Sequence, residues 1–148
     1  MIYRLILVAL LAATFARAAE HQTDYATLKT RAAAAKISDQ DKLYAQLAMS
    51  ATAVANDRYT AGDVPKAQES IDEAVSFAEK ARDAALHSNK NLKQTEITLR
   101  ETSRRMEDLR RSLALEDRPY VETAINRIET IRKQLLDQMF GIKPKEKK

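Results

Sequence analysis

Three side chains with the chemistry of metal ligands recur at four-residue steps in the middle of the chain: Glu79, Asp83 and His87. In a helix these steps place side chains on one face, where carboxylate and imidazole groups can together hold a divalent ion. The same spacing is typical of a solvated face, on which a histidine near the negative C-terminal end of a helix is favoured without any ligand. We favour the solvated face, so the sequence predicts no bound metal and keeps these three residues as candidates.

The composition offers little other material for catalysis. The 148 residues include two His, two Gly and no Cys, which excludes disulfides, a cysteine nucleophile, a thiolate metal site and a glycine-rich phosphate loop. The Glu-x-x-His pattern of di-iron bundles and the Ser-x-x-Lys pattern of serine nucleophiles are both absent from the sequence. We therefore expect no enzyme activity, no catalytic residue and no cofactor.

Arginines crowd residues 100–118. Such a stripe either binds phosphate or another polyanion, or forms a solvent face crossed by ion pairs. Glu101 precedes Arg105 by four residues, and Glu107 precedes Arg111 by four, in the orientation that stabilises a helix. Because acids interleave with the bases in this way, we favour the ion-paired solvent face.

The chain opens with the pattern of an export signal. Arg4 precedes an apolar run from Leu5 to Ala16, and Ala16-Arg17-Ala18 places small residues at both positions that a signal peptidase reads. The run of about a dozen residues is shorter than the roughly 20 that span a bilayer, and an uncleaved membrane anchor is the alternative. We predict a signal peptide over residues 1–18, cleavage after Ala18, and a periplasmic or secreted protein with no transmembrane segment.

Most of the positive charge lies at the two ends of the chain. Of 25 Lys and Arg and 21 Asp and Glu, residues 1–18 hold two bases and no acid, and residues 143–148 hold four bases and one acid. The body between them is left with 19 bases against 20 acids, which argues against nucleic acid as a partner. We expect residues 19–142 to form one helical domain and residues 143–148 a basic disordered tail.

Capping and stop signals divide the body into helices. The predicted helices cover residues 23–36, 38–61, 63–87, 91–115 and 117–140. Ser38 and Asp63 are the expected N-caps, Gly62 and Gly141 are stops, and His21 falls before the first helix. The resulting fold class is all-α, with antiparallel helical hairpins forming a four-helix bundle-like domain and a short extra N-terminal helix.

Apolar stripes at three- and four-residue steps mark the predicted core, and the two hairpins differ in composition. The first is rich in alanine, whereas residues 86–113 contain none. Since small residues bury little area, we expect the first hairpin to be the softer half. The second carries a coiled-coil-like seam with a facing stripe of matching period. Seam and stripe comprise Leu99, Met106, Leu113, Ile128 and Leu135.

The stretch Ala48 to Ala74 resembles a tetratricopeptide-type helical hairpin. The matching residues are Ala55, Gly62, Asp63, Ala67, Ile71 and Ala74. Ala51 and Arg58 depart from the family pattern, which has a bulky aromatic and a tyrosine there. The resemblance implies a groove for a peptide or partner helix, but nothing repeats after about 34 residues as in a solenoid, so no binding residue is carried over.

Two functions fit these observations. The first is an exported, non-catalytic interaction module, an adaptor or holdase-like protein that presents one hairpin face to a protein partner or self-associates. The second is a bundle that holds a small apolar ligand or a metal ion between its helices. An interaction module should expose an apolar stripe, whereas a ligand carrier should have a closed pocket with polar groups turned inward.

Overall fold

The computed structural model describes residues 19–142, so the predicted signal peptide and basic tail lie outside the described residues. All regular secondary structure in this part of the chain is helical, which confirms the all-α prediction. A leading helix covers residues 19–34. It is followed by α2 (Ile37–Thr60), α3 (Val64–Ser88), α4 (Leu92–Ser112) and α5 (Arg118–Met139).

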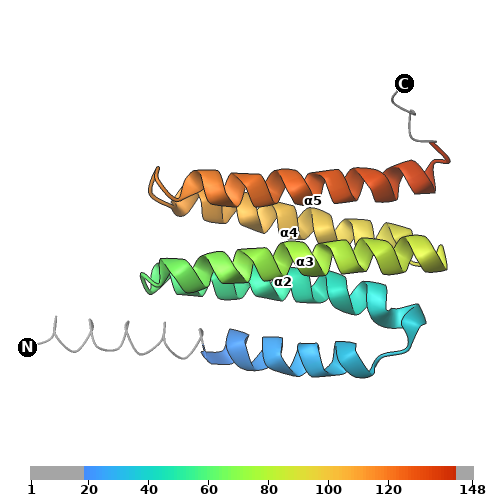
Figure 1. Ribbon diagram of the computed structural model, residues 1–148, viewed down its shortest axis with the longest axis horizontal. Coiled ribbons are helices and arrows are strands. Elements are labelled where there is room, and N and C mark those ends of the chain that lie inside the picture. The colour runs from blue at the N-terminus through green and yellow to red at the C-terminus, as the bar shows by residue number, and fades with distance from the viewer. Residues whose placement is uncertain (1–18, 143–148) are drawn as a thin grey trace, which may run out of the picture.

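The helices form two antiparallel hairpins, α2–α3 and α4–α5, which stack along their lengths (Figure 1). α2 lies beside α4 and α3 lies beside α5. Because consecutive helices run in opposite directions, each of these neighbouring pairs is parallel. The leading helix packs on the first hairpin, on the side away from the second (Figure 1). The alanine-rich hairpin is therefore the middle of three layers.

Two of the predicted helix starts are wrong. α2 begins at Ile37, so Lys36 rather than Ser38 holds the N-cap position, and its side chain makes no capping hydrogen bond. The leading helix already includes residues 19–22, which the sequence places before any helix. His21 lies in this first turn, and its Nδ1 is 2.7 Å from Asp57 Oδ2 of α2. A tertiary contact thus extends the helix beyond its local capping signal.

The predicted turns are confirmed. The Asp63 carboxylate accepts a hydrogen bond from the backbone N–H of Lys66 and caps α3, directly after Gly62 with its positive φ of 78°. The interruption expected at residues 87–90 is real, because Asn89 and Asn91 adopt left-handed backbone with φ of 51° and 54° between α3 and α4. Asn tolerates this conformation better than other non-glycine residues, which explains a tight turn without glycine.

The predicted core positions are largely confirmed. On α3, every predicted stripe residue after Val64 is buried. These buried residues are Ala67, Ile71, Ala74, Ala78, Ala81 and Ala85. In the second hairpin, Leu99 and Met106 of α4 are fully buried together with the facing stripe on α5, whereas Leu113 is only half-buried just beyond the end of α4. The core thus runs the length of the bundle.

The helices of the described part also bear on membrane insertion. Between residues 19 and 142, no helix is long and apolar enough to cross a bilayer.

Candidate functional site

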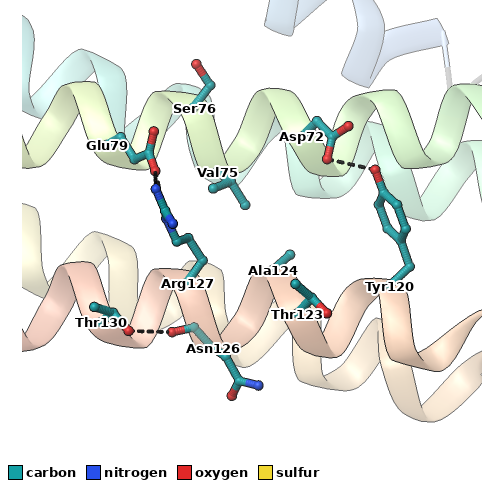
Figure 2. Close-up of a pocket in the computed structure, with 10 residues that line it drawn as sticks. All are labelled: Asp72, Val75, Ser76, Glu79, Tyr120, Thr123, Ala124, Asn126, Arg127 and Thr130. Atoms are coloured by element: carbon teal, nitrogen blue, oxygen red, sulfur yellow. Dashed lines mark hydrogen bonds and ion pairs between the residues drawn. The ribbon is translucent and has the colours of Figure 1, made fainter.

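An open groove runs between the parallel helices α3 and α5 (Figure 2). Its volume is about 610 Å³. The residues that line it are Asp72, Val75, Ser76, Glu79, Tyr120, Thr123, Ala124, Asn126, Arg127 and Thr130. The groove lies on the side of the bundle where the two hairpins meet, so it exists only when both hairpins are folded and stacked.

Two polar bridges cross this groove. The Tyr120 hydroxyl donates a hydrogen bond to Asp72 Oδ1 at 2.7 Å. Arg127 donates through Nε to Glu79 Oε1 at 2.8 Å, and its Nη2 is 2.6 Å from the same oxygen. Both bridges join residues 48 positions apart, and they are separated by seven residues on each helix, which corresponds to about 10 Å along the axis.

Between the bridges the groove is apolar. Val75 of α3 points into this interval and Ala124 of α5 lies opposite (Figure 2). Ala124 is 6% exposed and Val75 is half-buried. The hydroxyl-bearing Ser76 and Thr123 are exposed at the rim. The arrangement is a short apolar window framed by α3, α5 and the two bridges.

The electrostatics of the two bridges keep both of them intact near neutral pH. Burial and, after it, the hydrogen bond to Asp72 raise the pKa of Tyr120 to about 12, so this phenol stays protonated and donating near neutral pH. The Glu79 carboxylate is matched by the Arg127 guanidinium. Both carboxylates are occupied across the groove, Asp72 by the Tyr120 hydroxyl and Glu79 by Arg127, so the two bridges tie α3 to α5.

The three candidate metal ligands do not converge. Glu79 is committed to Arg127 in the groove, Asp83 pairs with the neighbouring Arg82 at 2.8 Å, and His87 is exposed near the end of α3. Among residues 19–142, no group of three His, Cys, Asp or Glu side chains is placed to hold a metal ion. Asp83 and His87 lie on a solvated face, as the sequence suggested, whereas Glu79 takes part in a contact between α3 and α5.

Local sequence patterns do not distinguish Asp72, which lines the groove, from the neighbouring Glu73, which does not. Asp72 and Glu73 are adjacent acids, yet they face different neighbours: Asp72 meets Tyr120 of α5, and Glu73 accepts hydrogen bonds from Tyr25 and Lys29 of the leading helix, each at 2.7 Å. The hydrogen bonds and the positive charge of Lys29 hold the pKa of Glu73 below its usual range despite burial. The two carboxylates therefore differ in their partners only because α3 packs between the leading helix and α5.

The arginine-rich stretch on α4 is an ion-paired face, as predicted. Arg105 is 3.3 Å from Glu101, and Arg111 is 3.3 Å from Glu107. Arg110 reaches Glu107 more closely, at 2.7 Å, and its hydrogen bond is the main reason that the pKa of Glu107 falls to about 2. These arginines are therefore mostly occupied by acids of their own helix.

A more buried ion pair joins α4 and α5. Arg132 of α5 contacts Glu96 of α4 at 2.7 Å and Glu129 of its own helix at 2.7 Å. Glu96 is only 6% exposed, and Arg100 approaches its second oxygen at 3.6 Å. A charge this deeply buried needs its partner, so the network fixes the register of the second hairpin.

The expected apolar surface stripe is not present in the described part of the chain. Its exposed large apolar side chains are Ile97, Leu115, Phe140 and Ile142. They lie on α4, in the α4–α5 connection and just after α5, so they do not form one stripe along a hairpin.

Comparisons with protein families, with curated proteins and with solved structures find no match to this chain. The tetratricopeptide resemblance of residues 48–74 therefore stays a prediction, and function has to be inferred from the groove and the surface.

Proposed function

We propose that this protein is an exported, non-catalytic interaction module that binds a helical segment of a protein partner in the groove between α3 and α5. The observation that carries the proposal is the apolar window around Val75 and Ala124, closed at both ends by side-chain bridges. A hydrophobic groove is a common binding site for the apolar face of an amphipathic helix.

The size of the window fits a helix. Side chains one turn apart on a helix are about 5–6 Å apart, so the interval of about 10 Å between the bridges accommodates an apolar pair at positions i and i+4. The volume of about 610 Å³ is enough for two such side chains and leaves their helix outside. We expect leucine or methionine at these positions, since both are flexible enough to fill a shallow apolar hole.

The charges of the two bridges favour a partner that carries a positive charge at one position. Glu79 and Arg127 neutralise each other, whereas Asp72 is exposed and forms no ion pair with any cation among residues 19–142. A partner helix that places a lysine or arginine beyond its apolar pair, toward Asp72, would add a favourable rim contact. Rim contacts of this kind contribute specificity and association rate more than affinity.

The alternative function needs a different interior. A carrier of a small apolar ligand or of a metal requires an enclosed site with convergent polar groups. The groove between α3 and α5 is instead open to solvent, and its charged groups and Tyr120 are paired across the two helices rather than converging on an enclosed site. The same groove could take up a second copy of this chain, and the experiment below separates that outcome.

The test uses a photo-crosslinking amino acid placed at Ser76, on the exposed rim, in cells that export the protein. A matched control carries it at Ala114, which is exposed outside the groove. We expect an adduct at position 76 and none at 114, with the attached peptide containing apolar residues at i and i+4 of a helical segment. Filling the groove with Thr123→Trp should abolish the adduct.

Three results would overturn the proposal. One is an adduct that Thr123→Trp leaves unchanged, and another is an adduct only with phospholipid or a small molecule. The third is equal labelling from positions 76 and 114. An adduct between two copies of the chain would show that the groove binds a second copy of this protein rather than a different protein.

A further inference from the structure

One end of the bundle brings together three segments that are distant in the sequence. The side-chain amide of Asn91, in the α3–α4 turn, donates to Asp41 Oδ1 near the start of α2 at 3.4 Å. The side-chain amide of Gln138, near the end of α5, donates to Asn89 Oδ1 of the same turn at 3.3 Å. The start of α2, the α3–α4 turn and the end of α5 therefore form one surface, on the right in Figure 1.

This surface is basic. Its exposed lysines are Lys36, Lys42, Lys90 and Lys93. None of them forms an ion pair within the part of the chain that the structure describes. Of the acids nearby, Asp41 is 1% exposed and Asp137 pairs with Lys133 at 3.2 Å, which leaves Asp39 as the exposed acid without an ion pair. The lysines thus dominate the charge that this end presents to its surroundings.

The same surface exposes apolar side chains. Phe140 is 72% exposed and Ile142 is 57% exposed, just beyond the end of α5. The sequence that follows, Lys143-Pro144-Lys145-Glu146-Lys147-Lys148, adds four lysines and one glutamate directly after this point. The name basic end is used below for Phe140 and Ile142 together with the exposed lysines of the described part, which are Lys36, Lys42, Lys90 and Lys93.

Among residues 19–142, the opposite end of the bundle has no such combination. Leu115 is as exposed as Phe140, at 72%, but Glu116 and Asp117 follow it in the connection between α4 and α5. The adjacent α2–α3 turn contributes Asp63, whose pKa is lowered chiefly by its hydrogen bond with Lys66. Within residues 19–142, exposed apolar residues beside lysines without an ion pair are therefore found at one end of the bundle.

We infer that the basic end docks this protein on an anionic lipid surface, with Phe140 and Ile142 entering the interface and the lysines lying among the headgroups. Separated lysines around an aromatic and an aliphatic side chain are the chemistry that recognises such a surface. The lysines come from separate segments and line no common cavity among the hollows that the structure shows, so they suit a plane of phosphates better than one bound anion. This inference does not rest on the function proposed above.

Docking at this end leaves the groove accessible. Each helix from α2 to α5 has one of its two ends at the basic end, so a membrane contacting it would meet the helix ends rather than their sides (Figure 1). The groove between α3 and α5 would then face sideways into solvent, where a partner can reach it. Lipid docking and partner binding can therefore fail separately in experiments.

The absence of tryptophan from the chain allows a direct test. Phe140→Trp places a single reporter in the basic end, and Leu115→Trp places a matched reporter at the opposite end. With vesicles of phosphatidylcholine containing about one third phosphatidylglycerol, we expect a blue shift of emission for position 140 only. Pure phosphatidylcholine vesicles should cause no shift, and Lys90→Gln with Lys93→Gln should weaken vesicle binding about fivefold for each lysine removed.

The control for charge and hydrophobicity is Arg104→Gln with Leu115→Ser. These residues are exposed outside the basic end, and Arg104 forms no ion pair with another described residue, so vesicle binding should be unchanged. Failure to bind anionic vesicles would overturn the inference, as would equal shifts from positions 140 and 115. Binding to a soluble polyanion such as heparin that competes with vesicles, without any shift at position 140, would reassign the lysines to an acidic polymer.

Discussion

Replacing Leu99 with alanine is the sharpest test of how this bundle is held together. Leu99 is fully buried on α4, which contacts α2, α3 and α5. Truncating a buried leucine to alanine removes its transfer free energy and leaves a cavity, at a cost of about 2–5 kcal/mol. Because Leu99 is fully buried on a helix that contacts three others, which cannot all collapse into the space, we expect a loss of about 3–4 kcal/mol, a large share of a total stability of about 5–15 kcal/mol.

The loss converts into a measurable change of thermal midpoint. Unfolding entropy is about 2.1 cal/mol/K per residue, or about 0.25 kcal/mol/K for a domain of this size, so a loss of 3 kcal/mol lowers the midpoint by about 12 °C. Urea titration followed by circular dichroism should give the same loss at constant slope, since a change of slope would mean a different denatured state rather than a weaker core.

Leu113→Ala is the matched control within the same seven-residue seam. Leu113 is only half-buried and follows the last residue of α4, so its truncation should cost about 1 kcal/mol. Equal losses for the two variants would refute the reasoning, because a uniform seam would not distinguish a central level from an end. A loss below about 1 kcal/mol for Leu99→Ala would show that the core does not depend on this level.

Three further outcomes are expected. Arg132→Ala should lower the free energy of unfolding, measured in urea, by about 3 kcal/mol, because it leaves the buried Glu96 carboxylate without its main partner. Replacing both Glu96 and Arg132 with leucine should lower it by less, and equal losses would contradict this reasoning. The pKa of Tyr120 is raised from 10 to about 12, so its contribution to stability is complete below pH 10 and is lost as the pH rises toward 12; Tyr120→Phe should therefore show a shallower alkaline decline in thermal midpoint. In native-state hydrogen exchange, the sequence predicts easier opening for residues 39–87 than for 92–139, but the middle position of the first hairpin leads us to expect protection at least as high there.

Local signals in the sequence were enough to predict the helices and most of the core. Asp63 and Gly62 define the α2–α3 turn through a side-chain cap and a positive φ, both of which depend on residue type alone. The buried face of α3 follows from three- and four-residue steps of alanine. The starts of the leading helix and of α2 are the exceptions, and the N-cap Lys36 of α2 makes no side-chain capping hydrogen bond that a sequence signal could mark.

The groove could not be predicted because it depends on how two helices are aligned. Asp63-Val64-Pro65 and Asp117-Arg118-Pro119 start their helices 54 residues apart, yet the bridges across the groove join residues 48 apart. α5 is therefore shifted by six residues, or about 9 Å, relative to a simple repeat of α3. This shift depends on how the two hairpins stack on each other, which the signals along one helix do not encode.

The alanines connect the stability of the fold to the shape of the groove. Judged by area alone, they weaken the first hairpin, because each buries little surface. Fully buried between neighbours, they are instead side chains that permit a close approach of helix axes, and the Tyr120–Asp72 and Glu79–Arg127 bridges span α3 and α5 beside them. A larger side chain at Ala124 would fill the window and push these helices apart, so the small residue is needed both for packing and for the hollow beside it.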